Sequence, residues 1–380
     1  MKVLYAAYKY DPRNPDLGSS VDYECYMAIQ RAGFEIEVVG PVTESLSIAE
    51  RVEYWLWRQY TKITGKKNLK FPLTLAWRSS QILNKAVRII QPDVVFSIFQ
   101  PFFMYYRGNV PYVWHFDTTF YGLQQDWPVY GSLPLKISIW QERRALARAA
   151  YVITTSHWSR QILIDKYQAD AGRVEVLPLP AAIPTDVVPP ADTLPDMKMD
   201  LPLRILLVGR VYERKGIDIA IEAVSELNGQ GLPAVLTVCG IDQKPQGVPE
   251  FVQFVGPYQK SDPQQLKQYV NWYQWAHLLI HPARFEPAGI VPSEAAAFGV
   301  PTLTNDTGGL ATTVEHNVSG IVLPKASSAS RYANEIMDLY RDPQRYARLR
   351  RTTRERYDRE LNWNASGAML ADILRKAAAR

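Results

Sequence analysis

Cysteine is almost absent from this 380-residue sequence, which contains only Cys25 and Cys239 and no Cys-x-x-Cys pair. So few cysteines exclude a disulfide framework and a cysteine-based zinc site, and they are typical of a reducing compartment.

Long apolar runs are missing as well. No stretch approaches the roughly 18 residues that a membrane-spanning helix needs, and the apolar start of the chain is too short for a signal peptide. We therefore expect a cytoplasmic protein.

Acidic pairs of the Asp-x-Asp kind are missing from the predicted strand ends, because Asp170, Asp186 and Asp306 each stand alone. Such pairs hold divalent metals through their carboxylate oxygens, so we expect no metal site. A strong net charge is missing too: the formal charge is +5, which permits anionic partners without identifying any.

The sequence does contain a strand–loop–helix alternation that runs twice. The first run begins with a strand at Lys2–Tyr8 and a helix at Ser20–Arg31, and the second begins at Leu203. Between them, residues 178–202 hold seven prolines and show no apolar periodicity, which is typical of a linker. We predict an α/β protein with two doubly wound domains. Its parts would be a first domain (1–182), a linker (183–202), a second domain (203–358) and a final helix (359–380).

The most informative stretch is Arg284–Pro301, with the sequence RFEPAGIVPSEAAAFGVP. The apolar run before it predicts a buried strand, and its prolines and glycines predict a helix that begins at Gly289–Pro292 and ends near Phe298. Glu286 would then lie on a loop and Glu294 on the helix, so both can face one ligand at the helix N-terminus. Carboxylates suit the vicinal hydroxyls of a sugar. The alternative is that both only complement the helix dipole.

This stretch resembles the Glu-x7-Glu signature of the retaining GT-B glycosyltransferases of the GT4 family (glycosyl transferases group 1). The likeness runs from the Glu-Pro-x-Gly start to the Glu-Ala-x-Ala-x-Gly-x-Pro end, covers most of the second half of the chain and is looser in the first half. It implies the GT-B fold, in which two Rossmann-like domains face each other across a cleft. An acceptor-side domain would come first and a nucleotide-sugar-binding domain second, and the C-terminal helix would cross back onto the first domain.

The resemblance also implies roles for residues of the second domain. Glu286 would hold hydroxyls of the donor sugar, and Glu294 would hold the ribose hydroxyls of the nucleotide. Arg210 and Lys215 would bind the donor pyrophosphate; the alternative is that they are solvated charges, since Glu213 could pair with either. The remaining donor contacts would come from Ala288, Gly289, Ile290, Gly308 and Gly309.

The resemblance to the GT4 family also concerns three further positions. His115 lies near the carboxyl end of a predicted strand, where open α/β sheets bind ligands, and the resemblance implies that it meets the donor sugar; a structural histidine is the alternative. Gly18 stands where the family usually has a glycine pair, and an ordinary loop-to-helix junction is the alternative there. Asn317 replaces a turn glycine, and asparagine tolerates the left-handed conformation of such a turn.

Together these observations predict a retaining, metal-independent glycosyltransferase. It would move a hexose from a nucleotide diphosphate sugar to an acceptor hydroxyl of a saccharide or a lipid-linked glycan. The nucleotide sugar would be a substrate, so no cofactor is expected, and cations would stabilise the leaving pyrophosphate in place of a metal. The alternatives are a sugar-nucleotide epimerase or phosphorylase of GT-B fold, and a non-catalytic sugar-nucleotide binding module. The nucleotide base, the sugar and the acceptor stay open, because loops without a readable code build those pockets.

Basic and aromatic residues are interleaved in Arg51–Arg78, which holds seven basic residues, six aromatic residues and a single acid, Glu53. This composition suits an anionic membrane surface. It also suits helices that cover a sheet and turn basic faces outward, and, least of the three, a site for single-stranded nucleic acid. The membrane interpretation would place the protein peripherally on the inner face of the membrane.

Overall fold

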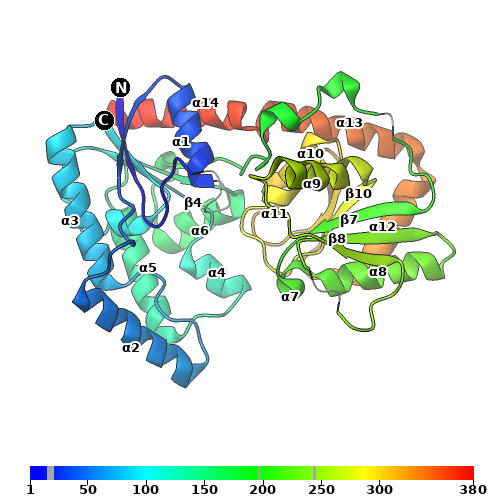
Figure 1. Cartoon of the computed structure of the whole chain (residues 1–380), viewed down its shortest axis with the longest axis horizontal. Coiled ribbons are helices and arrows are strands. Elements are labelled where there is room, and N and C mark those ends of the chain that lie inside the picture. The colour runs from blue at the N-terminus through cyan, green and yellow to red at the C-terminus, as the bar shows by residue number, and fades with distance from the viewer. Residues whose placement is uncertain (15–20, 196, 243–244) are drawn as a thin grey trace. The chain divides into compact units, whose positions relative to one another are not determined.

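The computed structural model describes residues 1–14, 21–195, 197–242 and 245–380. The chain divides into two compact units: unit 1 contains Met1–Leu177 and Ser366–Arg380, and unit 2 contains Pro178–Ala365. Each unit is built around a six-stranded sheet whose neighbouring strands pair in parallel (Figure 1). The predicted α/β class with two doubly wound parallel sheets is therefore confirmed. Gly18 lies outside the described residues.

Unit 1 begins with a strand and ends with a helix that returns from the C-terminus. Its strands are β1 (Lys2–Ala6), β2 (Glu35–Val39), β3 (Val94–Ser97), β4 (Tyr112–Phe116), β5 (Tyr151–Thr154) and β6 (Val174–Val176). Its helices are α1 (Val21–Arg31), α2 (Ile48–Thr64), α3 (Leu73–Ile90), α4 (Phe120–Asp126), α5 (Ser132–Leu146) and α6 (His157–Tyr167), with 3-10 turns at Gln100–Phe102 and Ala171–Arg173. The strand order is β2-β1-β3-β4-β5-β6, so the order reverses between β1 and β3, a position where such sheets bind ligands.

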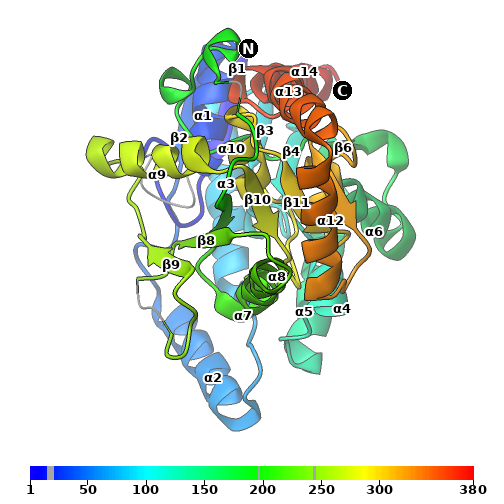
Figure 2. The same cartoon turned by 90° about the vertical axis from the view of Figure 1, so that its right-hand side faces the viewer.

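Unit 2 repeats this plan. Its strands are β7 (Leu203–Val208), β8 (Ala234–Cys239), β9 (Val252–Val255), β10 (Leu278–His281), β11 (Thr302–Asn305) and β12 (Gly320–Leu323). Its helices are α7 (Tyr212–Lys215), α8 (Ile217–Gly229), α9 (Pro263–Trp275), α10 (Ile290–Ala297), α11 (Leu310–Thr313), α12 (Ala329–Arg341) and α13 (Pro343–Glu360), with 3-10 turns at Thr185–Val187 and Ala191–Thr193. The strand order is β12-β11-β10-β7-β8-β9, with the reversal between β10 and β7. Figure 2 labels β8, β9, β10 and β11 of this sheet.

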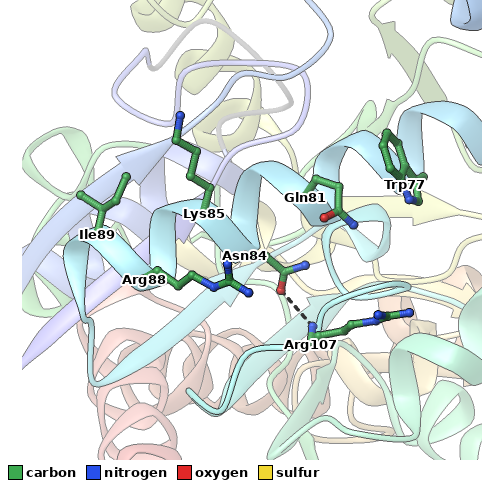
Figure 3. Close-up of a pocket in the computed structure, with 7 residues that line it drawn as sticks. All are labelled: Trp77, Gln81, Asn84, Lys85, Arg88, Ile89 and Arg107. Atoms are coloured by element: carbon green, nitrogen blue, oxygen red, sulfur yellow. Dashed lines mark hydrogen bonds between the residues drawn. The ribbon is translucent and has the colours of Figure 1, made fainter.

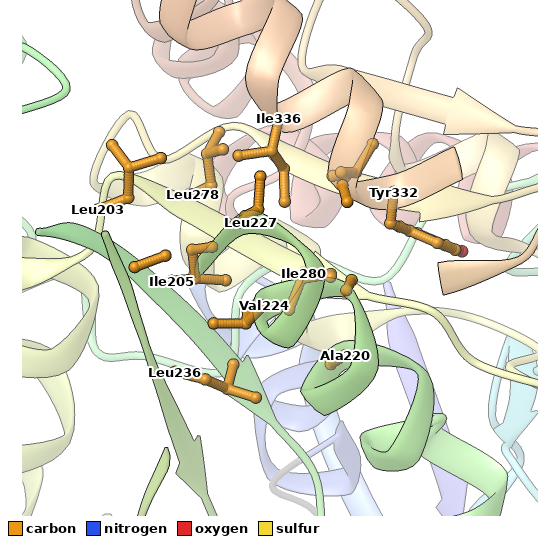
Figure 4. Packing of buried hydrophobic residues seen from close by; sticks show 14 of the residues in the cluster. Leu203, Ile205, Ala220, Val224, Leu227, Leu236, Leu278, Ile280, Tyr332 and Ile336 are labelled. Atoms are coloured by element: carbon orange, nitrogen blue, oxygen red, sulfur yellow. The ribbon is translucent and has the colours of Figure 1, made fainter. Parts of the chain in front are cut away.

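The core of unit 2 lies on both faces of its sheet, because side chains alternate along a strand. Leu203 and Ile205 of β7 join a cluster with Val224 of α8 and Ile336 of α12, which Figure 4 shows packed together. Leu206, on the opposite face, joins a second cluster that includes residues of α9 and α10. Strands buried on both faces read as continuous apolar runs, which is why Leu203–Val208 could be predicted as a strand.

The proline-rich residues 183–202 belong to unit 2 and pack against it. Ile183 is buried in the cluster beside α9 and α10. The carbonyl of Pro189 accepts a hydrogen bond from Arg354 Nη1 at 2.8 Å. A proline-rich segment has carbonyls that no strand partner uses, and Arg354 on α13 supplies a donor. The segment predicted as a linker is thus held on the second domain.

The last helix, α14 (Trp363–Ala378), leaves unit 2 and packs within unit 1 from Ser366 onward. A Cβ atom at Gly367 would lie 3.1 Å from the Cβ of Ala28 on α1. The guanidinium of Arg375 lies 4.9 Å from the centroid of the Phe34 ring, a distance at which cation–π attraction operates.

A buried carboxylate in unit 1, Glu142 of α5, holds the start of α4. It accepts a hydrogen bond from the Phe120 amide at 2.8 Å and another from the Tyr167 hydroxyl. Burial raises the pKa of Glu142 to about 8, although these hydrogen bonds and Lys70 oppose the rise. The folded protein therefore keeps a proton that the unfolded chain loses near pH 4.5.

We predict that this proton makes the folded state less stable as pH rises from about 5 to about 8, by at most about 1.4 kcal/mol per pH unit. The sign follows because the unfolded chain binds fewer protons than the folded chain in that interval. Glu142→Gln should flatten the slope, whereas the exposed Glu44→Gln should leave it unchanged. Urea denaturation of the three proteins across this pH range measures the effect. A slope that persists in Glu142→Gln would contradict it.

Candidate donor-side site

The carboxyl ends of parallel strands meet at one edge of a sheet, and the predicted residues of unit 2 gather at that edge. Arg210 follows β7, Glu286 follows β10, and the glycine pair follows β11. Strands β10, β7 and β11 are neighbours in the sheet. The sheet topology thus brings together segments that lie about 100 residues apart in the sequence.

Glu286 lies beside two cations and a buried histidine. Its Oε2 accepts a hydrogen bond from the Lys215 ammonium and lies 3.3 Å from Arg214 Nη1 and 3.7 Å from His281 Nε2. Glu286 and Lys215 are both buried. Burial alone would raise the pKa of the Glu286 carboxyl, but Lys215, His281 and Arg214 outweigh it and hold the pKa below its ordinary value. Glu286 is therefore a carboxylate at neutral pH.

The glycine pair supports the backbone of Glu286. Gly308 has φ of 58°, and a Cβ atom there would collide with the carbonyl oxygen of Glu286. The amide of Gly309 donates to the same carbonyl at 2.9 Å. Sequence reasoning expected this pair to approach the donor. In the structure, its close approach is to the loop that carries Glu286.

The next segment forms the N-terminus of α10. Gly289 has φ of 84° and precedes Ile290, the first residue of α10, and within the described part of the chain no side-chain hydrogen bond caps this helix. The carbonyl of Ala288 accepts a hydrogen bond from Thr313 Oγ1 at 2.6 Å, which fixes the turn. First-turn N–H groups without partners favour an anion. The helix ends at Ala297, as the glycine and proline positions predict.

Glu294 lies on α10 and is buried, and both of its oxygens have partners. Oε1 accepts from Lys260 Nζ at 2.5 Å. Oε2 accepts from the hydroxyls of Tyr269 at 2.5 Å and Tyr273 at 2.7 Å. Burial, with Glu294 adding to it, raises the pKa of both phenols well above the ordinary value, so both remain donors.

The two predicted phosphate-binding cations differ in environment. Lys215 is the last residue of α7 and is turned to Glu286, not to Glu213. Arg210 is exposed, and its Cγ would lie 3.5 Å from a Cβ at Gly240, the residue that follows β8. Lys215 is thus a counter-ion in the folded protein, and Arg210 remains available to a ligand.

His115 belongs to unit 1, where it is the fourth residue of β4 and is buried. Burial lowers its pKa to about 4, so the imidazole is neutral at neutral pH. Its Nδ1 lies 3.8 Å from Cys25 Sγ, and within the described residues its Nε2 has no hydrogen-bond partner. Leaving a buried polar atom without a hydrogen-bond partner costs free energy. A ligand that bonds to Nε2 would remove this cost.

Sequence reasoning missed five residues that contact the two glutamates. His281 ends a buried strand, the same signal that pointed to His115. Tyr269 and Tyr273 are four residues apart on α9, and therefore share one face, but so do many core residues. Arg214 and Lys260 gave no signal, because exposed cations are common in loops and short helices.

One cavity of the structure lies apart from the predicted site residues. Within the described residues, no group of three or more His, Cys, Asp or Glu side chains could hold a metal ion. A cavity of about 690 Å³ lies on the outward face of α3 in unit 1 and contains none of the predicted site residues (Figure 3). Its lining residues are Trp77, Gln81, Asn84, Lys85, Arg88, Ile89 and Arg107.

Known proteins resemble this chain in sequence and in fold. A family model described as "Glycosyltransferase Family 4" matches residues 23–181, and one described as "Glycosyl transferases group 1" matches residues 199–356. The D-inositol 3-phosphate glycosyltransferase of Xylanimonas cellulosilytica is 27% identical over 254 residues, which are 63% of this chain and 60% of that protein. The chain thus spans less than two thirds of the length of this relative.

Solved structures resemble the chain over its whole length. Sucrose-phosphate synthase from Thermosynechococcus elongatus has a TM-score of 0.67 at 18% identity, and the match covers 100% of this chain and 99% of that one. Anabaena HepE, solved in complex with UDP-glucose, has a TM-score of 0.60 at 17% identity, with 99% of each chain covered. At these identities the likeness shows the fold alone.

We predict that Lys215→Met lowers the free energy of unfolding by about 3 kcal/mol, the lower end for breaking a buried ion pair, since Arg214 remains near Glu286. Urea denaturation at neutral pH measures the change. The matched control is Arg284→Met, which breaks the half-exposed pair with Asp218 and should cost less than about 1 kcal/mol. Equal costs for the two variants would contradict the counter-ion role of Lys215.

Proposed function

Because the chain belongs to the GT4-like GT-B glycosyltransferases, we propose that it transfers a hexose from a nucleoside diphosphate sugar to an acceptor hydroxyl, with retention of configuration. The observation that carries this proposal is the pair of buried carboxylates, Glu286 and Glu294, beside the uncapped start of α10 at the carboxyl edge of the second sheet. Relatives named as transferases favour transfer over the epimerase and phosphorylase alternatives.

On the donor side, we assign the sugar hydroxyls to Glu286 and the ribose hydroxyls to Glu294. Ionised carboxylates accept strong hydrogen bonds from hydroxyl groups, and Glu286 is held in the ionised form by its neighbours. Arg210, Lys215 and the amides of Gly289 and Ile290 would face the diphosphate. Positive groups fixed where charge develops on the leaving diphosphate lower the barrier to breaking the glycosidic bond.

On the acceptor side, we assign to His115 a contact with the reacting sugar. Its neutral imidazole lies near the carboxyl edge of the first sheet, and its Nε2 has no hydrogen-bond partner among the residues that the structure describes. A neutral histidine can donate or accept one hydrogen bond from each ring nitrogen, according to its tautomer. A neutral imidazole suits a sugar hydroxyl better than a phosphate group, because a phosphate group favours a cation. We propose a saccharide acceptor, free or lipid-linked.

Helix α2 carries a feature that supports a lipid-linked acceptor. Its exposed apolar residues are Ile48, Val52, Trp55, Leu56 and Ile63, with exposed fractions from 51% to 83%. At about 100° per residue they fall within an arc of about 100°, and we name this arc the α2 stripe. Along one side of the stripe lie Arg51, Arg58 and Lys62. An apolar stripe flanked by basic residues is the pattern of a helix that lies in an anionic membrane surface.

Several other residues of Arg51–Arg78 have structural roles. Glu53 accepts hydrogen bonds from the amides of Leu73 and Thr74 at the start of α3, and Arg78 pairs with the buried Glu50. Phe71 is buried. Within the described residues no helix is long and apolar enough to cross a membrane. We infer that the α2 stripe and the basic residues beside it dock unit 1 on an anionic bilayer.

We predict that Glu294→Ala weakens the binding of a nucleoside diphosphate by about 1.5–3 kcal/mol, because the ribose hydroxyls lose a charged acceptor. Calorimetric titration with UDP, GDP and ADP measures this. Glu222→Ala, an exposed residue of α8 in the same unit, is the control and should bind as the wild type does. Unchanged affinity in a folded Glu294→Ala protein would leave Glu294 as a purely structural charge.

Turnover should persist without divalent metal, since Arg210 and Lys215 would supply the positive charge that a metal supplies elsewhere. Product formation from the donor that binds best is measured in excess EDTA and again after adding Mg²⁺ or Mn²⁺. Equal rates are expected. Loss of turnover in EDTA, with recovery on adding metal, would contradict the proposed role of the cations.

The double variant Trp55→Ser, Ile63→Ser should reduce co-sedimentation with anionic vesicles. The double variant Arg58→Glu, Lys62→Glu should also reduce it, because each basic residue near such a surface contributes about 1 kcal/mol. Binding should weaken as salt rises. The control is Ile89→Ser, which is 70% exposed on α3. Equal pelleting with neutral and anionic vesicles would overturn the α2 assignment.

A further inference from the structure

The surroundings of Glu294 contain an asymmetry that its assigned role does not explain. Two hydroxyls, from Tyr269 and Tyr273, converge on Oε2 at 2.5 and 2.7 Å, and their own oxygens are 2.9 Å apart. Among the described residues, Oε1 accepts one hydrogen bond, from Lys260 Nζ. One oxygen is therefore saturated by buried phenols, and the other is held by one flexible side chain.

The two tyrosines are fixed in place. Both are buried and come from adjacent turns of α9. The Tyr273 ring stacks on Phe298 at an angle of 11°, and the Tyr269 ring packs edge-on against Tyr273 at 87°. A ligand cannot displace these phenols without opening the core of unit 2, so Oε2 is closed to it. Only Oε1 is open to exchange.

Of the three side chains that bond to Glu294, Lys260 is the one that can move. Its side chain is 30% exposed, and its ammonium also donates to the Ala182 carbonyl at 3.0 Å and lies 5.0 Å from the centroid of the Tyr269 ring. A lysine is a compact charge on a flexible four-carbon stem. It satisfies Glu294 when no ligand is bound, because a buried carboxylate without a counter-charge is strongly destabilising.

A second cation lies in the same region. Burial raises the pKa of the Cys239 thiol to about 12; Glu294 adds to this rise, and both Lys260 and Arg210 oppose it. Both cations therefore lie within electrostatic reach of the end of β8, where Arg210 approaches Gly240. A diphosphate bound by Arg210 would enter this field and attract the Lys260 ammonium.

We propose that Lys260 is a placeholder for the nucleotide: the ribose hydroxyls displace its ammonium from Glu294 Oε1, and the ammonium then binds the diphosphate. This inference rests on the proposed nucleotide role of Glu294. Glu294 exchanges one donor for another and never lacks a partner. The site thereby selects ligands that carry both a ribose and a phosphate chain, because a bare nucleoside would displace Lys260 without offering it an anion.

The test compares nucleoside and nucleoside diphosphate binding in one titration series. The probes are uridine and UDP, with guanosine and GDP and adenosine and ADP run alongside. Lys260→Gln keeps a neutral hydrogen-bond donor for Oε1 but carries no charge for the phosphates, and Lys260→Met is a second neutral variant if Lys260→Gln does not fold. Lys260→Arg retains the charge, and Lys267→Gln, an exposed lysine of α9, is the matched control.

In the wild type the diphosphate should bind more tightly than its nucleoside. Lys260→Gln should reduce this ratio of affinities about tenfold, the size of one charge-assisted hydrogen bond, while nucleoside binding stays equal or becomes tighter. Lys260→Arg and Lys267→Gln should keep the wild-type ratio. If both ligands weaken by the same factor, Lys260 only positions Glu294, and if neither changes, it is a solvated charge; either result overturns the inference. A wild-type protein that binds none of the three diphosphates would instead refute the proposed function.

Discussion

The buried ion pair between Glu286 and Lys215 is the interaction on which the rest of the site depends. Burial alone would raise the pKa of Glu286, and Lys215, His281 and Arg214 outweigh it and keep the group ionised. To reach it, Lys215 must end its short helix with a sharp reversal, which Gly216 provides with φ of 67°; a Cβ atom there would collide with the Pro282 carbonyl. Gly308 plays the matching part on the other side of Glu286. Two glycines and one lysine thus fix the position and the charge of one carboxylate.

The sequence allowed the local part of this arrangement to be predicted. Proline and glycine positions indicated where α10 begins and ends, and Asn317 adopts the expected left-handed φ of 62°. The partners of the glutamates could not be predicted, because they come from elements that only the sheet topology brings together. Lys260 lies 34 residues before Glu294, and nothing in its neighbourhood indicates that α9 turns two tyrosines toward the same oxygen.

The stretch Arg51–Arg78 is a second case in which the sequence did not indicate which side chains contact each other. Its composition indicated a surface function, yet composition cannot assign side chains to faces. In the folded unit Phe71 is buried and Arg78 is used internally. The exposed apolar residues include Ile48, which lies just outside the stretch. Phe71 and Arg78 lie beyond the end of α2, whose periodicity places the exposed apolar residues on one side of the helix. The surface proposal follows from that exposed set.

The claim that Glu286 holds the donor sugar is central, and calorimetry with and without the sugar tests it most directly. Wild-type protein and Glu286→Gln are each titrated with a nucleoside diphosphate and with the corresponding nucleotide sugar. We predict that the sugar increases affinity in the wild type and that Glu286→Gln removes this increase while binding of the bare diphosphate is retained. A sugar contribution that is the same in both proteins would contradict it.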